Sequence, residues 1–376
     1  IDQADRWWPN AMFGSVQCAT HFPERCSMSS LSRTFLVLFL LLIGLPVQAA
    51  SVVFLSPGYA NERFWVDYAA FMQDAAGDLG MQLQVLYGER DAQVVLANAH
   101  AVLQRKVKPD YLVFVNEQYV GPEILRLYAD SRIKLLALHS TLTPEQRARL
   151  GGPREKYRNW IGSLVTNDEE AGYLMAKALI ALDPQGELVA FSGIKQTPSA
   201  TLREKGLQKA LAEHPQVRLR QLLYGEWKEQ RAYEQAKALL PRYPELDLVW
   251  AANDEMAFGV MRAARELGRR LHYSGLNTSE RLLQARIDGQ IEVVLGGHTI
   301  LGGCAMVLLH DHALGLDFAK RGGTDQQARL LRLFDQREAR NLLAYMRKPG
   351  EGLNFKRFSA QGKPRMQHYA CAIDAL

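Results

Sequence analysis

The feature that most constrains the fold of this chain is a repeated alternation of short apolar runs with segments of helical spacing. Apolar runs at Ser51–Leu55, Met81–Leu86, Tyr111–Val115 and Ile133–Leu138 are separated by stretches that predict amphipathic helices. A strand followed by a helix and another strand is typical of a parallel sheet covered by helices.

The same alternation restarts after residue 158. Its apolar runs are Trp160–Leu164, Leu188–Phe191, Val217–Leu223, Leu246–Trp250, Leu271–Leu276 and Ile291–Leu295. We therefore predict an α/β protein with two doubly wound, Rossmann-like parallel-sheet lobes. A cleft between two such lobes is a favoured place for a ligand.

The boundaries of these lobes are predicted from composition. Residues 140–158 are polar and irregular, and predict the crossing between the lobes. We expect residues 51–158 plus 298–318 to form the N-terminal lobe and residues 159–297 the C-terminal lobe.

Residues 319–376 form a basic C-terminal segment, and the sequence does not indicate to which lobe it belongs. Within it, Lys320–Arg365 contains twelve Lys or Arg against four Asp or Glu. Such an excess is typical of a solvated face, and a docking surface for an acidic partner is the alternative. Asn354–Phe358 predicts a last strand.

The start of the chain predicts a targeting segment. Arg33 precedes the apolar run Phe35–Leu45, and the small-residue pattern Val47–Ala49 follows it. A run of this length suits a signal peptide and is too short to span a bilayer. We expect residues 28–49 to be a cleaved signal peptide, with an uncleaved anchor as the alternative, and residues 1–27 to be an upstream extension or an artefact.

Cysteine usage and charge exclude several classes of protein. Cys18, Cys26, Cys304 and Cys371 match neither a zinc pattern nor a disulfide framework. Cleavage would leave the last two, so Cys304 is either an inert buried thiol or the partner of Cys371. The net charge of +5 is too mild to indicate nucleic-acid binding.

One junction between a strand and a helix stands out as a candidate binding position. The run Leu246–Trp250 leads to Asn253 and Asp254, and a helical pattern follows that ends at Gly268. Ligands of open α/β sheets bind at the carboxyl ends of the strands. A simple helix N-cap is the alternative reading of this polar pair.

This junction, AANDEMAFG, resembles the A-x-N-D-x-M-A-x-G segment of type I periplasmic sugar-binding proteins and of lactose-repressor-type regulators. The resemblance extends from about Ser51 to Phe318. It implies two lobes with a hinge and an interlobe cleft, in which Asn253 hydrogen-bonds sugar hydroxyls. A signal peptide stands where a repressor would carry its DNA-binding helices, so the resemblance favours a periplasmic protein.

The resemblance also implies further ligand-binding residues. Arg203, in LREKGLQKAL, corresponds to the family's ligand-gripping arginine, and Trp227, in YGEWKEQ, to an aromatic that stacks on the sugar. Phe64 and Trp65 resemble the paired aromatics of the first lobe, and Asp168 matches a weaker polar position. Surface or core roles are the alternatives, because most aromatic side chains belong to cores.

Several positions depart from the family pattern. Asn277 stands where an Asp is common, and His139-Ser140 stands where an Asp or Arg tends to follow the fourth strand. The segment GGHTILGG resembles autoinducer receptors and implies His298 at the hinge. Asn61 is a further candidate on a strand-end loop, as are Tyr59, Asn116 and Glu117.

The function implied is capture of a small sugar-like ligand by a monomer that uses no cofactor. Its membrane partner would be an ABC permease or, alternatively, a sensor kinase. An exported enzyme acting on a sugar is a less favoured alternative, because the chain lacks a G-x-G-x-x-G after its first strand, a Walker A loop and a G-x-S-x-G elbow. His310-Asp311-His312 suggests a metal site, but residues i and i+2 of a helix point about 200° apart.

Overall fold

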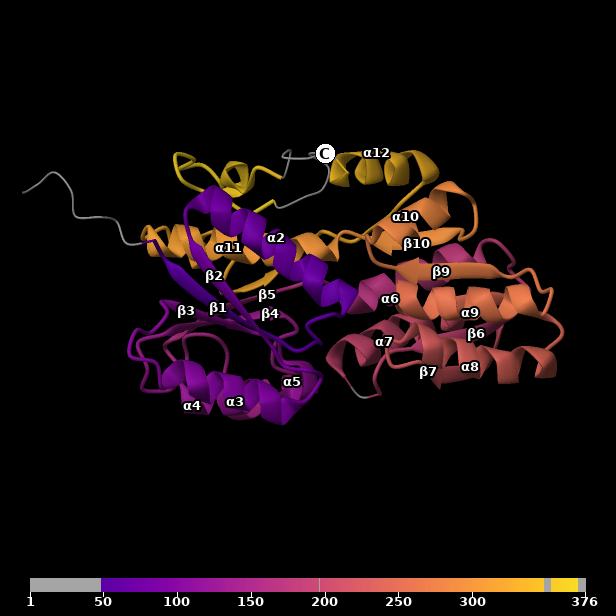
Figure 1. Ribbon diagram of the computed structural model, residues 1–376, viewed down its shortest axis with the longest axis horizontal. Helices are drawn as coiled ribbons and strands as arrows, with labels where there is room; N and C mark the ends of the chain where they lie inside the picture. Colours follow the sequence, from indigo (N-terminus) through magenta and orange to yellow (C-terminus); the bar gives the residue numbers. More distant parts are fainter. Residues whose placement is uncertain (1–48, 196, 348–352, 371–376) are drawn as a thin grey trace, which may run out of the picture. The chain divides into compact units, whose positions relative to one another are not determined.

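The computed structural model describes residues 49–195, 197–347 and 353–370. Its strands are β1 (Ser51–Ser56), β2 (Gln82–Tyr87), β3 (Tyr111–Phe114), β4 (Lys134–His139), β5 (Trp160–Val165), β6 (Glu187–Ser192), β7 (Arg218–Tyr224), β8 (Leu246–Ala251), β9 (His272–Leu276), β10 (Val293–Gly296), β11 (Asp325–Gln327) and β12 (Arg332–Leu333) (Figure 1). Its α-helices are α2 (Arg63–Leu79), α3 (Ala92–Leu103), α4 (Gly121–Leu127), α5 (Pro144–Leu150), α6 (Asp168–Ile180), α7 (Pro198–Glu213), α8 (Glu229–Leu239), α9 (Asp254–Glu266), α10 (Glu280–Ile287), α11 (Leu301–Ala313) and α12 (Gln336–Met346). The 3₁₀ helices are η1 (Glu117–Tyr119), η2 (Leu240–Arg242), η3 (His298–Ile300), η4 (Phe318–Lys320) and η5 (Phe355–Phe358).

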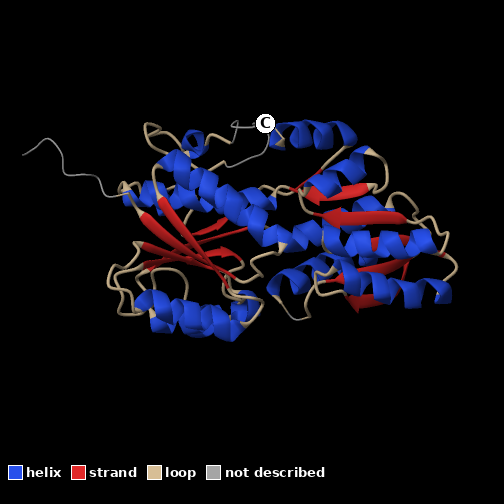
Figure 2. Cartoon of the chain, viewed as in Figure 1, coloured by secondary structure: helices blue, strands red, loops and turns tan. Residues whose placement is uncertain are grey.

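The strands form two separate sheets, one in each lobe (Figure 2). The first has the order β11-β5-β4-β3-β1-β2 and the second the order β12-β10-β9-β8-β6-β7. The described strand pairs are parallel except β10 with β12. The predicted fold class, two doubly wound α/β lobes, is confirmed.

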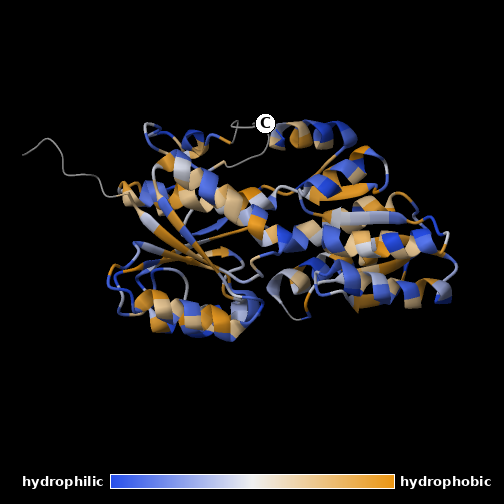
Figure 3. Ribbon diagram, viewed as in Figure 1, coloured by the Kyte–Doolittle hydropathy of each residue, from blue (hydrophilic) through white to orange (hydrophobic). Residues whose placement is uncertain are grey.

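Helices cover both faces of the first sheet, which explains why the centres of its inner strands β1, β3 and β4 are apolar. On β1, Val52 and Phe54 belong to the same core as residues of α2 and α11, whereas Val53 and Leu55 pack with α3 and α4. A parallel strand buried on both faces needs apolar side chains on both. The covering helices instead alternate hydrophobic with hydrophilic residues (Figure 3).

The predicted boundary between the lobes is wrong by one strand. Residues 160–164 were expected to begin the second lobe, but β5 pairs with β4 in the first sheet. The chain crosses only after Val165, because α6 packs against α7 and the second sheet. The polar stretch 140–158 contains α5, a helix without buried residues that Thr143 and Gln146 cap, so its composition resembles that of a linker.

The basic C-terminal segment contributes to both lobes. β11 joins the first sheet, β12 joins the second, and α12 packs against α10. The strand predicted at residues 354–358 is instead the 3₁₀ helix η5, whose Phe355 and Phe358 are buried and which packs against α2 and α11. Aromatic residues at i and i+3 lie on one face of a 3₁₀ turn, so both rings of η5 can be buried on the same side.

Some predictions concern residues beyond the described part. The signal peptide up to residue 48 lies outside it, as do Cys18, Cys26 and Cys371. Cys304 is buried in α11. Within the described residues, no helix combines the length and the apolar composition needed to cross a membrane.

Candidate ligand-binding site

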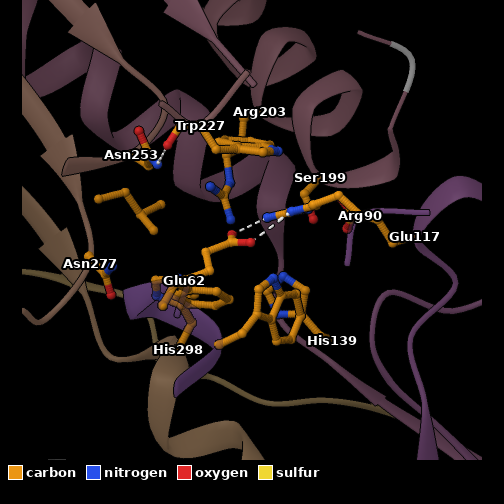
Figure 4. Close-up of a pocket in the computed structure, with 13 residues that line it drawn as sticks. Glu62, Arg90, Glu117, His139, Ser199, Arg203, Trp227, Asn253, Asn277 and His298 are labelled. Carbon is orange, nitrogen blue, oxygen red and sulfur yellow. Dashed lines mark hydrogen bonds and ion pairs between the residues drawn. The ribbon is translucent and has the colours of Figure 1, made fainter. Parts of the chain in front are cut away.

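A cleft with an empty volume of about 420 Å³ lies where loops of the two lobes face one another (Figure 4). Nearly all lining residues follow the carboxyl ends of strands, as expected for α/β sheets. From the first lobe and the β10–η3 crossing the cleft is lined by Glu62, Phe64, Trp65, Arg90, Glu117, His139 and His298, and from the second by Ser199, Arg203, Trp227, Asn253, Leu276 and Asn277.

The position of Arg203 follows from close packing of α6 against α7. A Cβ added to Gly172 would lie 2.0 Å from the carbonyl oxygen of Arg203, so only glycine permits this approach. Arg203 Nε donates to Asp168 Oδ1 at 2.7 Å, and Nη1 donates to the Ala252 carbonyl at 2.8 Å. Asp168 is therefore the buried counter-ion behind Arg203 and is absent from the described lining.

Trp227 is fixed between a glycine and the same arginine. The Arg203 Cζ atom lies 5.5 Å from the centre of the Trp227 ring. On the other side, a Cβ on Gly193 would come within 1.9 Å of Trp227 Cζ2. The indole thus presents a defined apolar wall to the cleft, in contact with a cation.

Asn253 and Asn277 both line the cleft and also make hydrogen bonds that stabilise the fold. Asn253 Oδ1 accepts the Met256 N–H at 3.0 Å, which makes it the N-cap of α9, and its Nδ2 donates to the Trp227 carbonyl at 3.3 Å. Asn277 donates to Asp254 Oδ1 at 3.2 Å and accepts the Thr278 N–H at 2.9 Å. A side-chain amide has two N–H groups and two acceptor lone pairs, so each retains capacity for a ligand.

Three charged side chains of the first lobe form one connected group. Arg90 donates through Nε and Nη2 to the Glu62 carboxylate, at 2.9 Å for Nε, and through Nη1 to Glu117 at 2.8 Å. They come from the loops after β2, β1 and β3 respectively. Burial raises the pKa of Glu117, although the neighbouring Arg90 acts in the opposite direction.

Aromatic rings form the rest of the first-lobe wall. Phe64 stacks on His298 with ring centres 5.1 Å apart, and His139 lies 5.6 Å from Phe64 and 6.2 Å from His298. Burial lowers the pKa of His139 to about 4 and that of His298 well below its ordinary value. Both imidazoles are therefore neutral near pH 7. Among the described residues, neither Nδ1 atom has a hydrogen-bond partner.

Backbone strain is concentrated around the cleft. Non-glycine residues with positive φ are rare and occur mainly where function requires them. Of the eight such residues in the described chain, all but Arg154 either line the cleft or lie within two residues of a residue that lines it. They are Glu89, Arg90, Gln118, Tyr119, His139, Glu226 and Trp227.

Most predicted site residues meet at this cleft. Eight of the ten line it: Phe64, Trp65, His139, Arg203, Trp227, Asn253, Asn277 and His298. Asp168 lies behind Arg203, and Asn61 is exposed and outside the described lining. Glu62, Arg90, Ser199 and Leu276 were missed, and Glu117 was identified only as a strand-end residue. The charge of Glu62 and Arg90 on strand-end loops was a signal that could have identified them. Charged residues on loops are usually solvated, so this signal alone does not indicate a binding site.

The described residues contain no cluster of three or more His, Cys, Asp or Glu side chains suited to a metal ion. In the segment His310–His312, Asp311 is buried and accepts hydrogen bonds from Ser359 Oγ and the Ala360 N–H. His312 Nδ1 lies 2.8 Å from the Tyr111 hydroxyl. These contacts anchor the C-terminal segment on α11 and leave no shared ligand position.

Comparison with known proteins gives consistent matches. A family profile described as "Periplasmic binding protein domain" matches residues 52–316. The crystal structure of a periplasmic sugar-binding protein from Pseudomonas fluorescens is similar over 86% of this chain and 98% of that one, with 52% identity and a TM-score of 0.80.

More distant relatives have assigned ligands. The ribose import binding protein of Salmonella typhimurium is 24% identical over 56% of this chain and 66% of its own length. The D-apiose import binding protein of Paraburkholderia graminis is 26% identical over 29% of this chain and 35% of its own length. The matches thus span under two thirds of these two relatives. Because the family profile covers well over half of the chain, this protein belongs to the periplasmic binding protein family.

Proposed function

We propose that this protein captures a small neutral sugar, or a similar polyhydroxylated ligand, between its two lobes in the periplasm. The observation that carries the proposal is the composition of the cleft. Aromatic rings lie beside side chains that form paired hydrogen bonds, and both lobes contribute both kinds. A sugar has apolar C–H faces and a rim of hydroxyls, and this combination of groups suits both.

The names of the relatives support the ligand class and the partner. Two of them are import binding proteins for pentoses, and the Pseudomonas fluorescens protein is named a sugar-binding protein. These names support an ABC importer as the partner that receives the sugar, and a sensor kinase is the alternative partner. The predicted signal peptide is consistent with the same compartment.

The cleft is better suited to binding than to catalysis. Its two carboxylates share one guanidinium, its histidines are neutral and lack polar partners among the described residues, and Asn253 is engaged in capping a helix. We therefore propose that the bound sugar leaves unchanged.

Calorimetric titration against a sugar panel tests this function. The panel comprises D-ribose, D-apiose, D-allose, L-arabinose, D-galactose and xylitol. We expect one-site binding of at least one member, and mass spectrometry should recover that sugar unaltered. Failure of every member to bind would contradict the ligand class, and appearance of a product would contradict the binding role.

A further inference from the structure

Glu62, Arg90 and Glu117 supply the only charged side chains on the first-lobe wall, as far as the described lining residues show. The position after β4 offers no charge, because His139 is neutral and packs against Phe64 and Trp65. Ser140 Oγ faces Ser199 Oγ of the other lobe at 3.4 Å. Any charged contact from this wall must therefore come from the group around Arg90.

Exposure orders these three side chains from the interior toward the cleft. The exposed fraction is 4% for Glu117, 11% for Arg90 and 21% for Glu62. Figure 4 shows the Glu62 carboxylate pointing into the middle of the cleft, with Arg90 beside it. Glu62 is thus the member placed to touch a ligand, and the other two lie behind it.

Hydrogen-bond accounting leaves one position open on Glu62. Each carboxylate oxygen can accept about two hydrogen bonds. Glu62 Oε2 accepts from Arg90 Nε at 2.9 Å and from the Tyr59 N–H at 3.2 Å. Oε1 accepts only from Arg90 Nη2 among the described groups. The open position requires a hydrogen-bond donor, such as a sugar hydroxyl.

The backbone holds this arrangement in place at a cost. Glu89 and Arg90 have φ values of 52° and 56°, in the left-handed region that such residues rarely adopt. Gln118, with φ of 52°, donates through Nε2 to the Arg90 carbonyl. Strain of this kind persists where the surrounding structure imposes a functional geometry.

We propose that Glu62 is the specificity-determining contact of the first lobe, that it accepts a ligand hydroxyl through Oε1, and that Arg90 is the residue that positions it. This inference rests on the proposed function and adds the residue that recognises the sugar. Because two carboxyl groups share one guanidinium, this wall favours hydroxyl donors over carboxylate or phosphate groups of a ligand.

A double-mutant cycle on Glu62 and Arg90 tests the proposal, with calorimetry on the tightest-binding member of the sugar panel. Glu62→Gln keeps the shape but removes the charge, so we expect affinity to fall about 10- to 100-fold. Glu62→Asp, one methylene shorter, should lose about tenfold. Glu123→Gln, on the exposed surface of the same lobe, is the matched control and should bind as the wild type does.

Arg90→Lys keeps the charge and loses the fork that orients Glu62, so it should weaken binding about tenfold in the wild-type background. In the Glu62→Gln background it should change affinity less than about twofold, because contacting residues couple. A purely structural role would lower the melting temperature without this coupling.

Each result decides the matter. Wild-type protein that binds no panel member would overturn the proposed function and this inference with it. Sugar binding that survives both Glu62 substitutions within about threefold would overturn the inference alone. Equal effects of Arg90→Lys in both backgrounds would overturn the positioning role.

Discussion

The two walls of the cleft are built on different principles. On the second lobe, Asn253 caps the helix that follows it, and Arg203 lies within a helix whose neighbour supplies its counter-ion. On the first lobe, Arg90 bonds to Glu62 and Glu117, which lie 28 and 27 residues away in sequence on separate loops. The second wall depends on helix geometry and the first on an ion-pair group that joins loops.

This difference has an energetic consequence. Arg203 and Asp168 are 5% and 4% exposed, so their pairing is part of the fold. Glu62 retains more exposure, and its loss would leave Arg90 with Glu117 as partner. We therefore expect variants of the second wall to change stability and affinity together, whereas variants of the first wall should act mainly on affinity.

The largest effect is expected at Arg203. Arg203→Met removes a ligand contact and leaves Asp168 buried without its counter-ion. Affinity for the panel sugar should fall at least about 30-fold, by analogy with buried charge pairs at interfaces. The free energy of unfolding should fall by about 3–5 kcal/mol. Calorimetry and denaturant melts measure the two quantities.

A second substitution separates the two roles of Arg203. Asp168→Asn in the Arg203→Met background removes the unpaired charge, so stability should partly return while affinity stays low. If affinity returned together with stability, Arg203 would act on the fold alone.

The next effect is expected at Gly193, which gives room to Trp227. Gly193→Ala places a methyl group against the indole and should displace it from Arg203, with an affinity loss of about tenfold. Trp227→Ala should lose a similar amount, and the double variant should lose little more. Gly77→Ala is the matched control, since a Cβ there meets nothing within 4 Å. Unchanged affinity in Gly193→Ala would contradict the stacking role.

The neutral histidines of the first wall predict a pH effect on stability. Unfolded His139 binds a proton near pH 6.5, whereas burial lowers its pKa in the folded state to about 4. Between these values the unfolded state binds more protons, so the free energy of unfolding falls as pH falls. Above pH 6.5 both states are neutral and the effect vanishes.

Comparison with a variant isolates this contribution. Burial raises the pKa of Glu117 and Glu255, so these groups act with the opposite sign. In His139→Asn this titrating group is absent, and asparagine tolerates the left-handed backbone at this position. The variant should lose less stability than the wild type when the pH falls from 6.5 to 4.5. The slopes should differ by up to about 1.4 kcal/mol per pH unit. If the free energy of unfolding of the two proteins changed with pH at the same slope, a neutral buried His139 would be contradicted.

Asn253 and Asn61 were both predicted to bind the ligand, and the smallest effect is expected at Asn61. Asn253→Ala should lose roughly tenfold in affinity and about 1 kcal/mol of stability, because it lines the cleft and caps α9. Asn61→Ala should change affinity less than about twofold, because Asn61 is exposed and outside the described lining. Calorimetry on both variants measures this, and a large loss at Asn61 would mean that the loop after β1 closes onto the sugar.

Sequence reasoning predicted the fold well because apolar alternation is a local signal. It missed the sheet to which β5 belongs, since strand pairing between distant segments leaves no mark in composition. It mistook η5 for a strand, because two aromatics three residues apart fit more than one local structure.

The candidate site was predictable where residues occur in recognisable local motifs, as Asn253 and Arg203 do. Asp168 was predicted as a ligand contact because it matches a weaker polar position of the family pattern, but only the packing of α6 on α7 shows that it pairs with Arg203. Glu62 and Arg90 were missed, because their partnership depends on loops that the fold alone brings together.

The central claim is that both walls hold one sugar at once. A crystal structure of the protein with the tightest-binding panel sugar tests this directly. We predict sugar hydroxyls within about 2.7–3.2 Å of Glu62 in the first lobe and Arg203 in the second, with the sugar face against Trp227. A sugar that contacts only one lobe, or lies outside this cleft, would contradict the account.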